Sequence, residues 1–184
     1  NALEPREKTA FDLWLKEQMG FKVTVNDMSS GHLSVFIEEA DGKMINMADS
    51  GFGYSQVIPV LAQIWNIIYN KQRENNNKQD AITIIIEQPE LHLHPKMQFR
   101  LGRLIACTAG LAKKNGIDVS FLIETHSDHM VNAIGDAVEH KEISEKDCSV
   151  YLVEKDVTQQ IKEVNFNKLG QLTDGWPYGF FEGR

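Results

Sequence analysis

Two short apolar runs, each followed by a helical stretch, constrain the fold of this chain most strongly. Residues 82–86 read Ile-Thr-Ile-Ile-Ile, and residues 119–123 read Val-Ser-Phe-Leu-Ile. Continuous runs of this length are typical of strands buried on both faces of a parallel sheet. A third run at 150–153 and helices expected at 95–114 and 127–140 complete a β-α-β-α-β order. This order predicts an α/β fold with a parallel sheet and helix crossovers.

The flanking segments predict further elements. The apolar spacing predicts amphipathic helices over residues 5–19 and 55–70. Short β-prone runs separated by Asn-Asp and Asp-Gly turns predict antiparallel hairpins or a meander before the second of these helices. These runs, and one further strand expected after the core, lie at residues 21–25, 33–38, 44–48 and 161–166.

Composition excludes several classes of protein. The 184 residues include 19 Lys and Arg against 26 Asp and Glu, so the net charge of −7 gives no bulk attraction to DNA or anionic membranes. The chain has two cysteines, Cys107 and Cys148, which argues against a disulfide framework or a cysteine zinc site and fits a reducing cytoplasm. All apolar runs fall far short of the ~20 residues of a membrane helix. We therefore expect a cytoplasmic protein without a membrane partner.

Polar clusters follow the first two runs. Residues 87–90 read Glu-Gln-Pro-Glu, and residues 124–129 read Glu-Thr-His-Ser-Asp-His. Ligands of open α/β sheets bind at the carboxyl ends of the strands. If the two strands are parallel neighbours, Glu87 and His126 emerge at the same edge. A carboxylate at such a strand end can hold Mg²⁺, usually through water.

A third cluster opens the helix expected at 55–70. Residues 49–56 read Asp-Ser-Gly-Phe-Gly-Tyr-Ser-Gln, with small residues directly before a helix N-terminus. Free backbone N–H groups and the positive end of the helix dipole make such a terminus suited to anions. An ordinary N-cap serine with turn glycines has the same pattern, so this cluster alone does not decide between the two.

The chain resembles the ABC-type ATPase superfamily, nearest its RecF-like, overcoming-lysogeny-defect-like branch. Three motifs in this order carry the resemblance: SGxGxSQ, then hhhhhEQPExHLHP, then hhhETHS, where h is a residue of an apolar run. That branch includes ATPases of bacterial anti-phage systems such as Septu. The resemblance covers residues 45–184. It implies a P-loop NTPase fold, ATP and Mg²⁺ as cofactors, and a homodimer closed around ATP. It also implies nucleic-acid processing or phage defence with a nuclease partner. Residues 174–182 resemble the Trp-Pro-x-Gly-Phe-Phe tail of a bacterial group of AAA-family ATPases.

The resemblance also implies roles for single residues. Glu87 of the Walker B segment would hold Mg²⁺, Gln88 would orient the attacking water, and His126 would hydrogen-bond the γ-phosphate. Glu90 is the candidate general base or, alternatively, a contact of the turn known as the D-loop. The signature loop, which would face the nucleotide of a partner subunit, comprises Ser50, Gly51, Gly53 and Gln56.

Two departures from the family pattern matter. No GxxxxGK[ST] motif occurs, and the Gly42-Lys43 pair lacks the upstream glycine. We therefore expect the nucleotide-gripping P-loop to lie upstream and this chain alone to bind ATP poorly. Gln88 stands where most such enzymes have an acid, and a neutral amide cannot accept a proton. Either Glu90 substitutes, or hydrolysis is slow and ATP acts mainly as a clamp.

On this view residues 1–184 form a single partial ATPase domain. A helix and β-hairpin lead-in covers residues 1–50. The core with the signature helix, the Walker B strand and the switch histidine covers residues 51–166, and a tail covers residues 167–184.

Three alternatives stay open. A metallohydrolase would use a transition-metal site drawn from His92, His94, His126, His129, Glu90, Glu124 and Asp128. A Toprim-type nuclease is suggested faintly by Val-Glu-Lys-Asp at residues 153–156, although the downstream Asp-x-Asp is missing. A noncatalytic scaffold with the shape of an ATPase would also account for the missing P-loop.

Overall fold

The computed structural model describes residues 5–27, 33–73, 81–153 and 161–174. The chain divides into two compact units, which are described separately below. The first comprises Asn1–Asn75 and Pro89–Met97, and the second comprises Asn76–Gln88 and Gln98–Arg184. Within the described residues, no helix is both long enough and apolar enough to cross a membrane.

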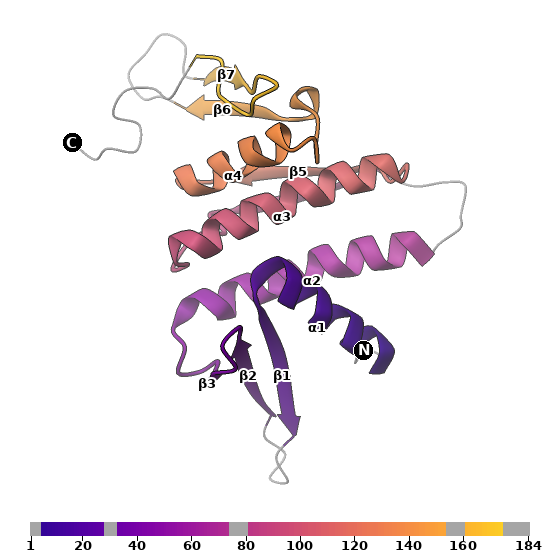
Figure 1. Cartoon of the computed structure of the whole chain (residues 1–184), viewed down its shortest axis with the longest axis vertical. Coiled ribbons are helices and arrows are strands. Elements are labelled where there is room, and N and C mark those ends of the chain that lie inside the picture. The colour runs from indigo at the N-terminus through magenta and orange to yellow at the C-terminus, as the bar shows by residue number, and fades with distance from the viewer. Residues whose placement is uncertain (1–4, 28–32, 74–80, 154–160, 175–184) are drawn as a thin grey trace, which may run out of the picture. The chain divides into compact units, whose positions relative to one another are not determined.

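The first unit combines two helices with an antiparallel meander (Figure 1). Strand pairing runs from Phe21↔Glu39 to Asp27↔Leu33 and continues on the other side of the middle strand. The predicted helices and hairpins are thereby confirmed, although the second helix begins at residue 52 rather than 55. The elements are α1 (Pro5–Met19), β1 (Phe21–Asp27), β2 (Leu33–Glu39), β3 (Met44–Asn46) and α2 (Phe52–Arg73).

An aromatic cluster packs α1 against α2 in the first unit. The rings of Phe11, Trp14 and Trp65 lie with centroids 5.4 to 6.0 Å apart. Apolar residues spaced three and four apart on each helix extend this contact, because such spacing gathers them on one face. The buried residues of this core include Leu15, Met19, Phe21, Ile37, Val57, Leu61 and Ile64.

The second unit is built on two parallel strands joined by a helix. Pairing runs in register from Ile82↔Val119 to Glu87↔Glu124, which confirms the predicted α/β arrangement with a helix crossover. The crossover helix spans residues 95–114 as predicted, with proline at its first position, where a missing N–H costs little. The elements are β4 (Ile82–Glu87), α3 (Pro95–Lys114, of which the first three residues belong to the first unit), β5 (Val119–Glu124), α4 (Asp128–Glu139), β6 (Ser149–Val153) and β7 (Ile161–Asn165).

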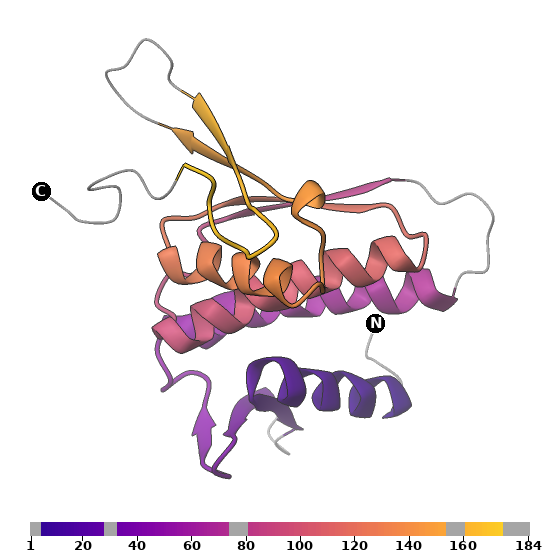
Figure 2. The same ribbon diagram turned by 45° about the horizontal axis from the view of Figure 1, so that its top comes forward.

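Helices α3 and α4 run along one side of the β4–β5 pair (Figure 2). Side chains on the other face are exposed: Ile85 is 67% accessible and its neighbour Leu122 is 57% accessible. The expectation that both strands are buried on both faces was therefore wrong, because α3 and α4 cover a single face. Glu87 and Glu124 share the exposed face with these two residues.

Strand β6 does not extend the parallel sheet. Among the described residues it pairs antiparallel with β7, from Ser149↔Asn165 to Val153↔Ile161. The prediction of a third parallel strand at 150–153 was wrong, while the predicted strand at 161–166 is confirmed as β7. Antiparallel neighbours in the chain need no helical crossover, unlike the parallel pair β4 and β5.

Candidate functional site

The carboxyl ends of β4 and β5 carry two adjacent glutamates. Glu87 and Glu124 are register partners, and the Gln88 N–H donates a 2.8 Å hydrogen bond to the Glu124 carbonyl. Neighbouring strands lie ~4.8 Å apart, so both carboxylates are exposed side by side. Hard oxygen donors at this spacing suit a divalent cation such as Mg²⁺. The pair is the chemically most informative feature of this edge.

The loop after β5 is held by side-chain hydrogen bonds. The Ser127 N–H donates to Thr125 Oγ1 at 3.0 Å, and Ser127 Oγ accepts from the Met130 N–H at 3.2 Å as the N-cap of α4. Ser127 Oγ also donates to Gln98 Oε1 of α3 at 2.6 Å. Ser127 is 5% exposed, whereas the intervening His126 is exposed. The histidine is thus presented to solvent from a fixed backbone, two residues beyond Glu124.

The turn after β4 is held by its backbone. Gln88 and His92 adopt left-handed conformations, with φ of 43° and 60°. The Leu93 N–H donates to the Glu90 carbonyl at 3.0 Å. Side chains without β-branches tolerate such φ values at a cost of roughly 1–2 kcal/mol. The turn also buries Glu90, which is 6% exposed.

The signature loop predicted from sequence forms the start of α2. Ser50 Oγ donates to the Met47 carbonyl at 2.8 Å, and Gly51 has a φ of +78° with open space around its Cα. Gly53, in contrast, is buried, while Gln56, the fifth residue of α2, is exposed. The first N–H groups of a helix lack intrahelical partners, which leaves donors at this end of α2.

A hollow of about 430 Å³ adjoins this loop within the first unit. Gly51, Phe52 and Ser55 form its α2 side, and β2 with the segment after β3 forms the rest. The hollow therefore adjoins the start of a helix, an end whose first N–H groups and dipole favour anions.

The predicted residues therefore fall into two sets. Glu87, Gln88 and His126 belong to the second unit, and the β4–β5 pairing brings Glu87 and the His126 loop to the same edge. The signature-loop residues and Glu90 belong to the first unit.

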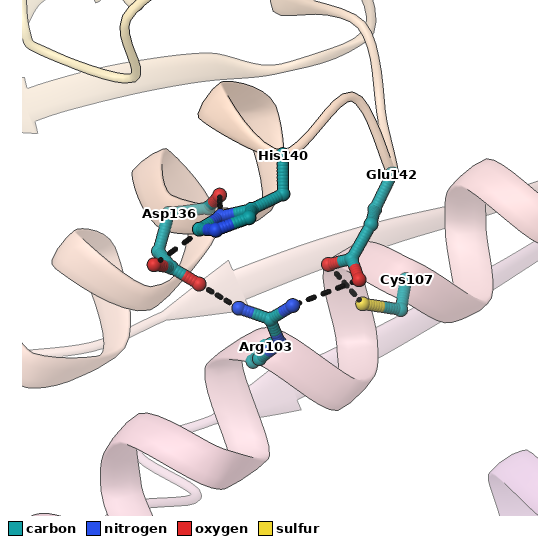
Figure 3. Close-up of polar contacts among 5 residues, drawn as sticks. All are labelled: Arg103, Cys107, Asp136, His140 and Glu142. Carbon is teal, nitrogen blue, oxygen red and sulfur yellow. Dashed lines mark hydrogen bonds and ion pairs between the residues drawn. The ribbon is translucent and has the colours of Figure 1, made fainter.

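An ionic cluster elsewhere in the second unit joins α3 to α4 (Figure 3). Arg103 pairs with Asp136 and, at 2.8 Å, with Glu142, which also accepts from the Cys107 thiol at 2.9 Å. Burial and this hydrogen bond raise the pKa of Cys107 to about 12. Burial likewise raises the pKa of Cys148 to about 11. These shifts disfavour the thiolate, which is the reactive form of a cysteine.

The structure does not support the metallohydrolase alternative. In the described residues, the grouping of suitable ligand atoms is Asp136, Glu139 and His140 rather than either of the histidine clusters named from sequence. Most of the Toprim-like segment, residues 154–156, and most of the Trp-Pro-x-Gly-Phe-Phe segment lie outside the described residues.

Sequence reasoning missed three supporting residues. Glu124 entered only as part of the metal alternative, and Gln98 and Ser127 were not assigned to the ATPase site. The position of Ser127, directly before a helix that opens with an acidic residue, was an available N-cap signal. The Gln98 contact depends on tertiary packing, for which the sequence has no local sign.

Comparisons with known proteins identify the family of this chain. A family model described as an AAA ATPase domain matches residues 2–131, more than half of the chain. Endonuclease GajA of Bacillus cereus (strain HuB5-5) is 31% identical over 86 residues, which cover 45% of this chain and 12% of that protein. The chain thus spans about an eighth of the curated relative that it matches.

The solved structures matched by this chain include SMC ATPases, all with TM-scores below 0.5. One, from work on ATP-driven dimerization and DNA-stimulated activation of SMC ATPases, is 13% identical with a TM-score of 0.49, covering 88% of this chain and 84% of that one. The Smc head domain of Pyrococcus yayanosii is 12% identical with a TM-score of 0.47, and the match covers 88% of this chain and 27% of that one.

Proposed function

Because this chain belongs to the AAA ATPase domain family, we propose that it is part of an ATP-hydrolysing enzyme of the ABC-type, RecF-like branch. The observation that carries the proposal is the parallel, in-register pairing of β4 with β5. This pairing gives Glu87 and the His126 loop a common edge, and such edges are where α/β proteins bind ligands. The order of the motifs along the chain supports the branch.

The residues at this edge suit phosphoryl transfer, in which positioning and charge stabilisation do most of the work. Glu87, with Glu124 beside it, would hold Mg²⁺, which neutralises phosphate charge when bound. His126 would donate a hydrogen bond to the γ-phosphate, and Gln88 would orient water. Burial of Glu90 favours its role as a turn contact over that of a base. We therefore favour slow hydrolysis, with ATP acting mainly as a clamp.

The clamp would join two copies of the protein. Ser50 and Gly51, at the exposed start of α2, would face the nucleotide held by the partner subunit, together with Gln56. A link to nucleic acid is supported by the relative named as an endonuclease. Because the chain spans a small part of that relative, a nuclease activity or partner and a role in phage defence are proposals for the whole protein.

Substitution at the strand ends tests the proposed chemistry. In the whole protein with its Walker A motif, Glu87→Gln and His126→Ala should each lower ATP turnover at least tenfold, or ~1.4 kcal/mol in the barrier. Steady-state phosphate release would measure this. Glu163→Gln, on exposed β7, is the matched control and should keep the wild-type rate. Wild-type rates in both strand-end variants would refute the assigned roles.

A second substitution tests whether the signature loop contacts the nucleotide held by the partner subunit. Ser50→Arg should abolish ATP-induced dimers in light scattering, because a long cation would occupy the space of the partner's phosphate. Gln63→Arg, at an exposed position in the middle of α2, makes the same charge change and should leave dimers intact. Equal dimerisation by the two variants would exclude the signature-loop role.

A further inference from the structure

The first turn of α2 touches the turn that follows β4, within the first unit. A Cβ atom on Gly53 would lie 2.6 Å from the His92 carbonyl oxygen and 3.3 Å from the Leu93 side chain. Cβ atoms essentially never approach another atom so closely, so any larger residue at position 53 must displace the 90–93 turn. Gly53 is therefore required by packing, and Gly51 is the glycine that remains open to a ligand.

Side chains reinforce this backbone contact. The ring of Phe52 lies 5.7 Å from the ring of His92, tilted by 43°. The left-handed φ of His92, 60°, is an unusual conformation for a residue other than glycine and persists only where surroundings hold it. Glu90 and Leu93, 6% and 8% exposed, anchor the same turn from inside.

We propose that His92 is a positioning residue that couples the start of α2 to the turn carrying Gln88 and Glu90. This inference rests on the proposed function for its catalytic meaning. A single residue, Pro89, separates Gln88 from Glu90, so a shift of the 90–93 turn is passed to Gln88 through a short and buried connection. Contact of the signature loop with a partner's nucleotide would thereby adjust the residue that orients water.

Amide exchange tests the coupling without any ATPase activity. Gly53→Ala should speed exchange at least several-fold at the Leu93 amide, which donates to Glu90, and at the Gln88 amide, which donates to Glu124. The Met130 amide, capped by Ser127, should stay unchanged. Gln63→Ala, exposed in the same helix, should change none of the three. Unchanged exchange at Leu93 would overturn the contact, and a change at Leu93 without one at Gln88 would overturn its transmission.

Kinetics of the whole protein test the catalytic meaning. His92→Ala should lower kcat about fivefold while KM for ATP and ATP-induced dimerisation stay near wild type, and His92→Phe, which keeps an aromatic ring against Phe52, should recover most of the loss. Equal losses in both variants, or a raised KM with unchanged kcat, would overturn the positioning role. A wild-type protein without ATPase activity would instead overturn the proposed function, and the exchange result would still decide on the coupling. His92→Gly serves in the exchange test if Gly53→Ala does not fold: by removing the ring that lies against Phe52 it should speed exchange at both amides.

Discussion

Two loops leave neighbouring strand ends of this molecule and are held in different ways. The loop after β5 is fixed by side chains, with Ser127 bonded to α3 and to the first turn of α4. The turn after β4 has left-handed residues at positions 88 and 92, and its backbone at His92 packs directly against Gly53 of α2. The first loop should therefore respond to side-chain truncation, whereas the second should respond to changes in backbone freedom.

The largest effect should come from truncating the side-chain anchor. Ser127→Ala removes the N-cap of α4 and leaves Gln98 without this hydrogen bond, so unfolding should become easier by about 2 kcal/mol. Urea melts of the chain would measure the loss. Ser144→Ala removes an exposed cap from the three-residue 3₁₀ helix Glu145–Asp147 and should cost far less. Equal losses would mean that the bond to α3 contributes nothing to this loop.

In the turn after β4, we expect a substitution to raise the free energy of unfolding rather than lower it. Gln88→Gly should relieve the left-handed conformation and raise the free energy of unfolding by up to about 1 kcal/mol. Lys141→Gly, at another left-handed residue with φ of 60°, is the matched control for stability. Both variants should be more stable, and in the whole protein Gln88→Gly alone should lower ATP turnover. Reduced stability of Gln88→Gly would show that its side chain, rather than the turn, holds this position.

The difference between the loops also explains what could be predicted from the sequence. The order of β4, α3 and β5 followed from apolar runs and from Pro95, because both are local signals. Helix capping at Ser127 was readable for the same reason. The left-handed conformations of Gln88 and His92 were not, since residues other than glycine adopt this region only at single positions that the surrounding structure holds in place.

Features that depend on tertiary packing could not be predicted, because they too lack a local signal in the sequence. The apolar run at 82–86 indicated a strand, but how much of each face is covered depends on which elements pack there, and Ile85 is exposed. Strand β6 pairs with β7 rather than with β5, and the residues of one strand alone do not determine which strand it pairs with. The role of Gly53 depended on a contact with a turn distant in sequence.

The smallest expected change in stability concerns Glu87 and Glu124, the last residues of the two strands from which the loops start. Glu87 and Glu124 are adjacent like charges in register, and such pairs cost a few tenths of a kcal/mol up to about 1. Glu124→Gln should therefore raise the free energy of unfolding slightly in low salt, and the gain should shrink in 1 M NaCl as the charges are screened. Glu163→Gln, whose cross-strand partner is the uncharged Tyr151, should show no such salt-dependent gain. A gain that persists in high salt would mean that packing, rather than repulsion between the two strand ends, sets the difference. In that case, added Mg²⁺ should stabilise the wild-type chain no more than it stabilises the Glu124→Gln variant. Such a result would exclude the two glutamates as a cation site.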